Sequence, residues 1–310
     1  MLLDSAEAFG DQVARHQNEL LVHCYRMLGT IDEAEDAVQD ALARAWQGRQ
    51  TFQRSISFRA WLYRIATNVC LNAIEVRKRD RTQAQHVVGP SPDHLLTGVA
   101  AADSGPEARY DAHESVSLAF LTVLQILPPR QRAVLLLRDV LAFHAAEVAA
   151  LLDMSAAAVN SAQQRARATL RRNYNSSERS RTTMPAPQPS PRNLLERYVR
   201  AWEAADVAGL VALLREDAVL TMPPKPTVIG AGAIADFLAE SIFTIAPMRL
   251  VETHANGRPA FAAYFQAPAG RLSLFALLVI ASDSHQITHI HAFADPRVLA
   301  RFDLAAELAG

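Results

Sequence analysis

This chain contains little cysteine, and its positive and negative charges almost cancel. The 310 residues include two cysteines, Cys24 and Cys70, which are too few for a disulfide framework and lack metal-ligand spacing. Both fall in predicted amphipathic helices, so we expect buried free thiols in a reducing compartment, while a disulfide between them is left open. The formal net charge of −1 argues at first against a nucleic-acid partner. The positive charge is local, however, and gathers in residues 54–81 and 165–172.

Long hydrophobic runs are also missing. The chain reaches Asp4 and Glu7 without the apolar core of a signal peptide, and the longest clean apolar run, Leu274 to Ala281, is too short to span a bilayer. We therefore expect a cytoplasmic protein that has no membrane contact. Half of the residues, 50%, are hydrophobic, so the chain can bury sizeable cores in two or three domains.

The most specific pattern lies between Leu127 and Arg172 and predicts two helices joined by a tight turn. The first helix is expected over Ala145 to Leu152, the turn at Leu152 to Met154, and an N-cap for the second helix at Ser155. The apolar stripe of the second helix is expected at Val159, Ala162, Ala166 and Leu170. Its polar face fits a DNA major groove. The residues expected to read DNA are Asn160, Ser161, Gln164 and Arg165, with Arg167 and Arg171 also facing outward.

An ordinary solvated helix would show the same pattern, but the amino-acid sequence is more specific than the pattern alone. LPPRQRAVLLLRDV, followed by AVNSAQQRARATL, resembles the −35-binding module of the extracytoplasmic-function (ECF) sigma factors of bacterial RNA polymerase. Many members of that family carry Gly in the turn where this chain has Asp153. Asp tolerates the left-handed backbone conformation better than most residues, so the turn is still expected.

A second segment, DEAEDAVQDALARAW, predicts an amphipathic helix in which Asp32 is the N-cap and Glu35 reaches back to it. Its apolar stripe is expected at Ala34, Val38, Ala41, Leu42 and Ala45. The opposite face exposes Asp36, Gln39 and Asp40. An ordinary solvated helix surface would expose such residues as well. AEDAVQDAL resembles the sigma segment that docks on the β′ clamp helices. The resemblance implies that these three residues bind the polymerase core, whose β subunit is a further expected partner.

Next come a short polar loop and a long helix, in QTFQRSISFRAWLYRIATNVCLNAIEVRKRD. Inward packing is expected at Phe58, Trp61, Leu62, Ile65 and Val69. The segment is similar to the ECF element that opens −10 promoter DNA and holds a flipped base. The resemblance implies −10 DNA contacts for Phe52, Gln53, Arg54, Ser55, Ile56, Ser57, Arg64 and Asn68, while Trp61 is assigned to packing. The helix ends in a cationic run, Arg77, Lys78, Arg79 and Arg81, that suits phosphates.

Two weakly patterned segments divide the chain. Residues 82–114 carry scattered proline and no sustained periodicity, and residues 174–192 have proline at alternate positions near their end. We therefore expect an all-α core- and −10-binding domain over 8–81, a linker over 82–114 and an all-α helix-turn-helix domain over 115–173. A proline-rich linker over 174–192 and an α+β domain over 193–310 complete the chain.

The last domain is expected to place helices before a curved antiparallel sheet. Helices are predicted over Leu194 to Leu214, broken and capped at Asp206, and over Ala233 to Phe243. Strands are predicted near Met248 to Thr253, Ala260 to Gln266, Leu272 to Ser282 and Gln286 to Phe293, with a turn at Asn256 and Gly257. YVRAWEAADVAGLVALLREDAVLTMPP and NGRPAFAAY resemble a SnoaL-like domain, the conical fold of some polyketide cyclases and ketosteroid isomerases. A group of ECF sigma factors carries this domain as a C-terminal extension, which implies regulation in cis.

Chemistry in this extension would need a carboxylate with a His or Tyr in an apolar cone. The candidates are Asp236, His254, Tyr264, His289 and His291. The last two share one face of a strand, either the cone interior or the exterior, and no acid–base pair is identified by spacing. We expect no catalysis, cofactor or metal, and leave open a small ligand. The alternatives are a stand-alone helix-turn-helix regulator with a ligand-sensing domain and a SnoaL-like isomerase or cyclase.

Overall fold

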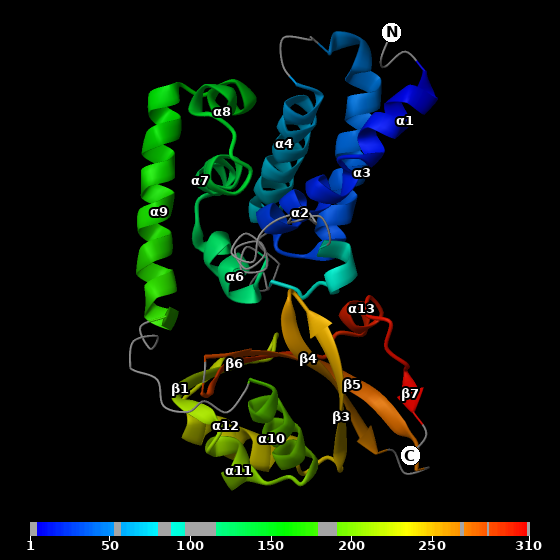
Figure 1. The fold of residues 1–310 in the computed structure, drawn as a ribbon, viewed down its shortest axis with the longest axis vertical. Helices are drawn as coiled ribbons and strands as arrows, with labels where there is room; N and C mark the ends of the chain where they lie inside the picture. The colour runs from blue at the N-terminus through cyan, green and yellow to red at the C-terminus, as the bar shows by residue number, and fades with distance from the viewer. Residues whose placement is uncertain are drawn as a thin grey trace. The chain divides into compact units, whose positions relative to one another are not determined.

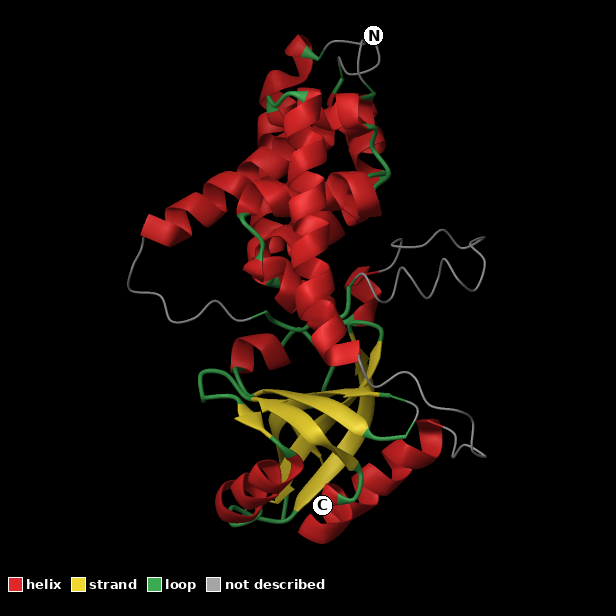
Figure 2. Ribbon diagram, turned by 90° about the vertical axis from the view of Figure 1, so that its left-hand side faces the viewer, coloured by secondary structure: helices red, strands yellow, loops and turns green. Residues whose placement is uncertain are grey.

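Helices make up most of the first unit of the chain, and a curved sheet dominates the second (Figures 1 and 2). The computed structural model describes residues 5–52, 57–79, 88–96, 116–178, 191–266, 270–283 and 285–308. The chain divides into residues 1–178 and 179–310, and each unit is described by itself. Among the described residues, no helix combines the length and the hydrophobicity needed to cross a bilayer.

The N-terminal module, residues 5–79 and 88–96, is built on three packed helices. Its elements are α1 (Ala6–Ala14), α2 (Gln17–Leu28), α3 (Ile31–Gly48), the short 3₁₀ turns η1 (Arg49–Thr51) and η2 (Asp93–Leu96), and α4 (Phe58–Arg79). Gly29 ends α2 with a φ of 94°, a conformation that glycine adopts without strain. Cys24 and Cys70 are buried free thiols, as predicted. Burial and the neighbouring Cys24 thiol raise the pKa of Cys70, so this thiol stays protonated at neutral pH.

The predicted cap of α3 is wrong by two residues. The helix begins at Ile31 with Thr30, not Asp32, at the N-cap. The Thr30 hydroxyl donates to the Glu33 carboxylate at 2.9 Å, so Glu33, not Glu35, is the acidic partner of the capping residue. Both sets of residues have the same spacing in the sequence, and packing decides between them because Ile31 is buried and must lie inside the helix.

The helix-turn-helix module, residues 116–178, follows the prediction closely. It contains α6 (Leu118–Ile126), α7 (Pro129–Leu135), a π-helical turn η3 (Leu136–Val140), α8 (Ala145–Leu152) and α9 (Ala156–Glu178). Asp153 lies in the turn with a φ of 52°, as its tolerance of the left-handed region predicted. The Ser155 hydroxyl accepts a hydrogen bond from the Ala158 amide at 3.1 Å, which confirms it as the N-cap of α9.

Both predicted linkers are partly structured. Within 82–114, the Gly89 amide donates to the Gly29 carbonyl at 2.9 Å, and the Tyr25 hydroxyl donates to the Gly89 carbonyl at 2.6 Å. Residues 88–96 therefore belong to the N-terminal module and not to a free tether. Within 174–192, α9 continues to Glu178 and α10 already begins at Pro191. The remaining linker residues, 82–87, 97–114 and 179–190, lie outside the described residues.

The second unit packs most of its helices against one face of a curved sheet, while its last short helix, α13, lies on the opposite side (Figure 1). Its helices are α10 (Pro191–Glu203), α11 (Val207–Val211), α12 (Ala231–Phe237), the π-helical turn η4 (Leu238–Ile242) and α13 (Pro296–Leu299). Its strands are β1 (Leu214–Thr221), β2 (Val228–Ile229), β3 (Met248–Ala255), β4 (Arg258–Gln266), β5 (Leu272–Ser282), β6 (Ile287–Phe293) and β7 (Glu307–Leu308). The strand order is β2-β1-β6-β5-β4-β3, with β7 beside β5. This α+β arrangement confirms the predicted fold class.

Two details of this unit differ from the prediction. The sheet is mixed and not purely antiparallel, because β1 runs parallel to β6. The first helical segment ends at Val211, and Leu214 already belongs to β1. The predicted break is confirmed, since the Asp206 carboxylate accepts from the Gly209 amide at 2.9 Å and caps α11. The hairpin turn between β3 and β4 is confirmed at Asn256 and Gly257, both with positive φ.

Candidate nucleic-acid interface

The face of α9 that was predicted to read DNA is exposed along the first turns of the helix. Asn160, Ser161, Gln164 and Arg165 are all exposed. On the opposite side, Val159, Ala162 and Ala166 are buried and fix the rotation of the helix, while Leu170 is only half-buried. Arg165 makes no ion pair within the part of the chain that the structure describes. A cation left free on an exposed helix face is available to a base edge or a phosphate.

Arg167 is exposed but not free, which sequence reasoning missed. Its guanidinium binds both carboxylate oxygens of Asp139, at 2.7 and 2.8 Å. The hydrogen bond and charge of Asp139 raise the pKa of Arg167. Gln163, which is buried, donates to the same carboxylate. Asp139 therefore ties α9 to the end of η3 and fixes the orientation of the exposed face of α9.

The predicted −10 residues are only partly brought together. Arg64 and Asn68 lie one turn apart on α4, and both are half-buried. The Arg64 guanidinium is 3.3 Å from the Asp153 carboxylate in the helix-turn-helix. The four central loop residues lie outside the described residues: Gln53, Arg54, Ser55 and Ile56.

The described ends of this loop have structural roles of their own. The Phe52 ring packs on Trp61 with 5.2 Å between ring centroids. Trp61 is buried, as its assignment to packing predicted. The Ser57 hydroxyl accepts from the Ala60 amide at 3.1 Å at the start of α4. These contacts hold both ends of the loop on the helix.

The acidic cluster on α3 is exposed, as its spacing predicted. Asp36, Gln39 and Asp40 are exposed on one side, while Ala34, Val38 and Ala41 are buried on the other. Arg44 binds both oxygens of Asp40, at 2.8 and 2.9 Å. Asp36 has no ion pair within the described ranges.

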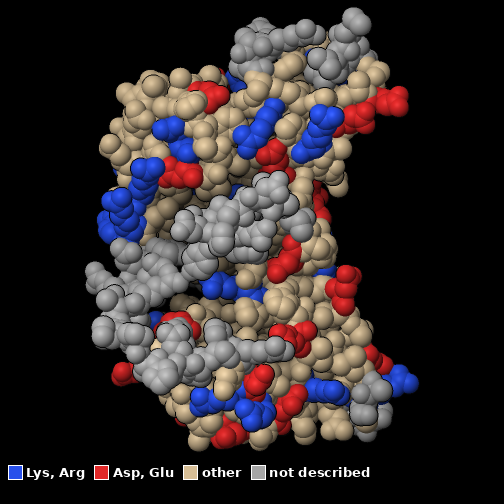
Figure 3. Space-filling view, in the orientation of Figure 1, with Lys and Arg blue, Asp and Glu red and all other residues tan. Residues whose placement is uncertain are grey.

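The cationic run at the end of α4 is largely paired. Arg77 binds the Glu33 carboxylate at 3.0 and 3.1 Å, and Arg79 binds Glu75 at 2.6 Å. Lys78 is exposed, and Arg81 lies outside the described residues. The run therefore offers fewer free charges to phosphates than the sequence predicts. Figure 3 likewise shows acidic and basic side chains interspersed over the face in view.

In the second unit, the two strand histidines face away from the conical interior. Their rings stack with 5.8 Å between centroids and 11° between planes. The intervening Ile290 and the following Ala292 line the interior cavity, so the alternation of β6 places His289 and His291 on the opposite face. Burial lowers the pKa of both rings, that of His291 to about 3, so both are neutral at pH 7.

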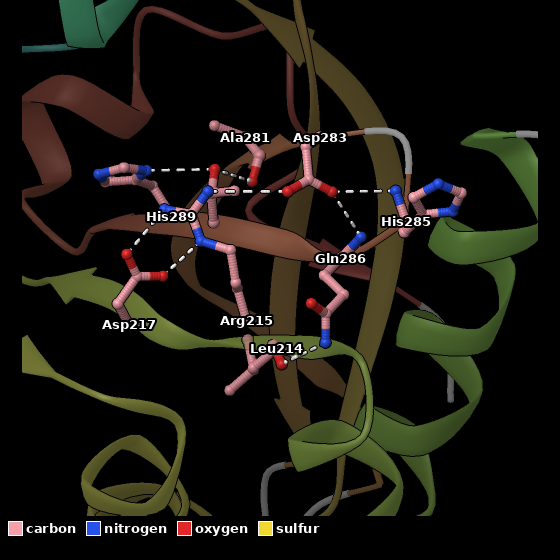
Figure 4. Close-up of polar contacts among 9 residues, drawn as sticks. Leu214, Arg215, Asp217, Ala281, Asp283, His285, Gln286 and His289 are labelled. Atoms are coloured by element: carbon pink, nitrogen blue, oxygen red, sulfur yellow. Dashed lines mark hydrogen bonds and ion pairs between the residues drawn. The ribbon is translucent and has the colours of Figure 1, made fainter. Parts of the chain in front are cut away.

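Polar neighbours surround His289 on this outer face (Figure 4). Its ring nitrogen lies 3.2 Å from the Thr288 hydroxyl, and Asp217 lies close enough to counteract the lowering of its pKa. Arg215 forms ion pairs with Asp217 and, at 3.7 Å, with Asp283. The polar groups of these residues form hydrogen bonds and ion pairs with one another, as in an ordinary polar network on a protein surface.

The interior cavity is entirely apolar in its lining and measures about 410 Å³, counting the part that is open to solvent. Trp202 from α10, Phe237 from α12, Leu238 and Ile242 from η4, and residues of the sheet form its walls. None of the five candidates for chemistry lines it. Asp236 and His254 are exposed, and the Tyr264 hydroxyl donates to the Ala305 carbonyl at 2.9 Å. Trp202 Nε1 and the Tyr198 hydroxyl are buried without a hydrogen-bond partner in the described structure.

Comparison with known proteins agrees with this architecture. Residues 12–82 match Sigma-70 region 2, residues 117–170 match Sigma-70, region 4, and residues 195–305 match the SnoaL-like domain. The ECF RNA polymerase sigma factor SigG of Mycobacterium tuberculosis is 39% identical over 317 residues, which cover 97% of this chain and 85% of SigG. The chain belongs to the ECF sigma factors.

Two further matches also cover nearly the whole of this sigma factor. A probable ECF sigma factor of the same organism, SigI, is 25% identical, and the match covers 95% of both chains. The crystal structure of M. tuberculosis SigJ covers 96% of the sigma factor and 100% of its own chain, with a TM-score of 0.67 at 22% identity, which shows a shared fold. The family predicted from the sequence is confirmed, and with it the function: the sigma factor binds RNA polymerase core and directs promoter recognition.

Proposed function

We propose that three surfaces of this sigma factor separately bind the polymerase core, the −10 element and the −35 element. The exposed face of α3, with Asp36, Gln39 and Asp40, binds the β′ clamp helices. The protein acts in the cytoplasm, because that is where its partner, the polymerase, works. Arg64 and Asn68, with the loop from Phe52 to Ser57, hold melted −10 DNA. Asn160, Ser161, Gln164 and Arg165 read the −35 element. The observation that carries this division is the free, exposed Arg165 on a helix whose orientation is fixed by Asp139.

Reading and melting are expected to separate in two single variants. Arg165→Ala is expected to weaken −35 binding by about 1–3 kcal/mol if the guanidinium contacts a base, and by less, without sequence bias, if it contacts phosphate.

Asn68→Ala is expected to spare the closed complex and to impair −10 opening, because its role begins once a base has left the stack. Permanganate footprinting of the promoter complex measures the opening. Normal opening by Asn68→Ala would contradict the −10 assignment.

The second unit is proposed to regulate the first in cis and to perform no chemistry. The support is the cavity, whose lining carries no acid–base pair. The Trp202 side chain lines the cavity, and its indole N–H is buried and unpartnered in the described structure. A buried donor without an acceptor is costly. In this structure the cavity is too small for a ligand, so we propose that it widens to take a small, mainly apolar molecule that brings one acceptor, such as a ketone oxygen, to this N–H.

This ligand is tested with 2-acetonaphthone, an aromatic ketone, as the probe. The full chain is expected to bind the ketone without converting it. Trp202→Phe is expected to weaken binding by about fivefold, because one neutral hydrogen bond contributes roughly 1 kcal/mol. Calorimetric titration measures the affinity, and Trp46→Phe in the N-terminal module is the matched control. Equal affinity for both variants would place the ketone elsewhere, and turnover would contradict the absence of chemistry.

A further inference from the structure

The first helix of the chain, α1, lies mostly outside the match to Sigma-70 region 2, which begins at residue 12. The Ser5 hydroxyl accepts from the Ala8 amide at 3.1 Å and caps this helix at its start. Two of its side chains, Phe9 and Val13, lie one turn apart and are each 7% exposed. The remaining residues of α1 are exposed or half-buried. Its attachment to the module therefore depends on what these two side chains contact.

The ring of Phe9 contacts aromatic rings from two later elements. It meets Trp46, in the last turn of α3, edge to face with 5.3 Å between centroids. It also meets Phe58, the first residue of α4, at 6.2 Å with the ring planes at 90°. The Arg49 guanidinium lies 3.7 Å from the Trp46 ring centroid and donates to the Trp46 carbonyl at 2.7 Å. Such aromatic pairs add stability beyond the area that they bury, so Phe9 joins the end of α3 to the start of α4.

Phe58 connects Phe9 to both described ends of the −10 loop. It directly follows Ser57, and its ring meets Phe52 edge to face with 5.8 Å between centroids. The Phe58 ring also contacts Trp61 at 5.7 Å, as the Phe52 ring does at 5.2 Å. Phe52 and Phe58 are both half-buried. The two ends of the loop are therefore fastened to each other through these rings, and Phe9 is a further partner of one of them.

The N-terminal helices supply two ring contacts to Phe58. Besides Phe9, the His16 ring lies 6.1 Å from it, and His16 is itself held by a hydrogen bond between Nδ1 and the Glu19 carboxylate. A site that holds a flipped base needs its groups within about 0.5 Å of the productive geometry. Precision of that kind depends on the packing of side chains that touch no base. Phe9 is placed to supply part of it.

We propose that α1 is a positioning element for promoter opening, in which Phe9 acts through Phe58 and Phe52 to fix the two ends of the −10 loop. The inference rests on the proposed −10 role of this loop. It deepens that role, because recognition of the −10 bases then depends on a residue that contacts no DNA. Binding to core polymerase and to the −35 element is expected to be independent of Phe9, since neither the acidic face of α3 nor α9 takes part in these ring contacts.

Phe9→Leu removes the ring and keeps an apolar side chain. In the full chain with core polymerase, it is expected to lower promoter opening by about fivefold, as the loss of one or two aromatic pairs should. Permanganate footprinting measures the opening, and titrations with core polymerase and with −35 DNA are expected to give unchanged affinities. Phe265→Leu is the matched control, because Phe265 forms a similar edge-to-face pair with Phe275 in the second unit. An equal loss of opening in the control would contradict the role of α1.

A second DNA separates a positioning role from a loss of folded protein. Opening is measured on the promoter and on the same promoter with its −10 bases replaced, and the ratio of the two is the discrimination. Less active protein would lower opening on both DNAs equally and would leave this ratio unchanged. Phe9→Leu is expected to lower the ratio by about threefold, because a loosely held loop distinguishes bases less well. An unchanged ratio would overturn the proposal.

Phe9→Met covers the case in which Phe9→Leu disturbs folding. Met fills irregular space and keeps a favourable contact between its sulfur and aromatic rings. Its discrimination is therefore expected to fall, though by less than that of Phe9→Leu. Thermal unfolding of the wild-type chain and both variants shows which of them fold. Wild-type discrimination by a folded Phe9→Met, together with a Phe9→Leu that does not fold, would make Phe9 a core residue without a positioning role.

The proposed function and this inference fail in different ways. If Asn68→Ala opens the promoter normally and the wild-type chain does not discriminate among −10 bases, the −10 assignment fails, and the role of α1 fails with it. If Asn68→Ala impairs opening while Phe9→Leu opens and discriminates as the wild-type chain does, only the role of α1 is lost.

Discussion

Reversing the charge of Asp36 and Asp40 together is expected to weaken binding to core polymerase by at least about tenfold, which corresponds to about 1.4 kcal/mol. Like charges facing a basic clamp cost more than the loss of a rim contact. The variant is Asp36→Arg with Asp40→Arg in the full chain. Titration of labelled sigma factor with core polymerase, in the absence of DNA, measures the affinity.

The fold is expected to tolerate this variant. The only described ion pair that it removes is that between Asp40 and Arg44, which is exposed on the surface of α3, and such i,i+4 pairs contribute about 0.2–0.5 kcal/mol. Asp236→Arg with Glu240→Arg is the matched control, because these exposed acids have the same spacing in the second unit. Affinity that is unchanged in the Asp36 and Asp40 variant, or lowered equally in the control, would contradict the clamp assignment.

The sequence was most informative where local chemistry decides the structure. The bounds of α8, the left-handed Asp153 and the Ser155 cap depend on residues within one turn of one another. The start of α3 was not predictable in the same way, because two capping residues, Thr30 and Asp32, each have a glutamate three positions later, and only the burial of Ile31 selects Thr30.

Contacts between distant residues account for most of what was missed in the candidate site. Arg167 looks free in the sequence, because Asp139, its partner, lies 28 residues away. Arg64 is paired with Asp153 across 89 residues. Strand alternation placed His289 and His291 on one face, but the choice of face depends on which side of β6 meets α10 and α12. The parallel pairing of β1 with β6 places Thr221 opposite His291, and no local sequence pattern predicts this pairing.

Removing the second unit is expected to raise promoter-directed transcription severalfold when the sigma factor is limiting. The change is a truncation after Ser180, which keeps all of α9. A domain on a linker of this length meets its own sigma modules at an effective concentration near the millimolar range. Even weak contacts then hold a form that does not bind polymerase. Run-off transcription with reconstituted holoenzyme, at equal protein concentration, measures the difference.

A chain that carries a protease site within residues 179–190 provides the control, since its composition is the same before and after cleavage. If tethering supplies the inhibition, cleavage is expected to raise transcription as much as truncation does, because a separated domain at micromolar concentration falls about a thousandfold below the tethered value. Lower transcription after cleavage would mean that the second unit braces the two DNA-binding modules instead. Equal transcription before and after cleavage, across protein and salt concentrations, would contradict regulation in cis of either sign.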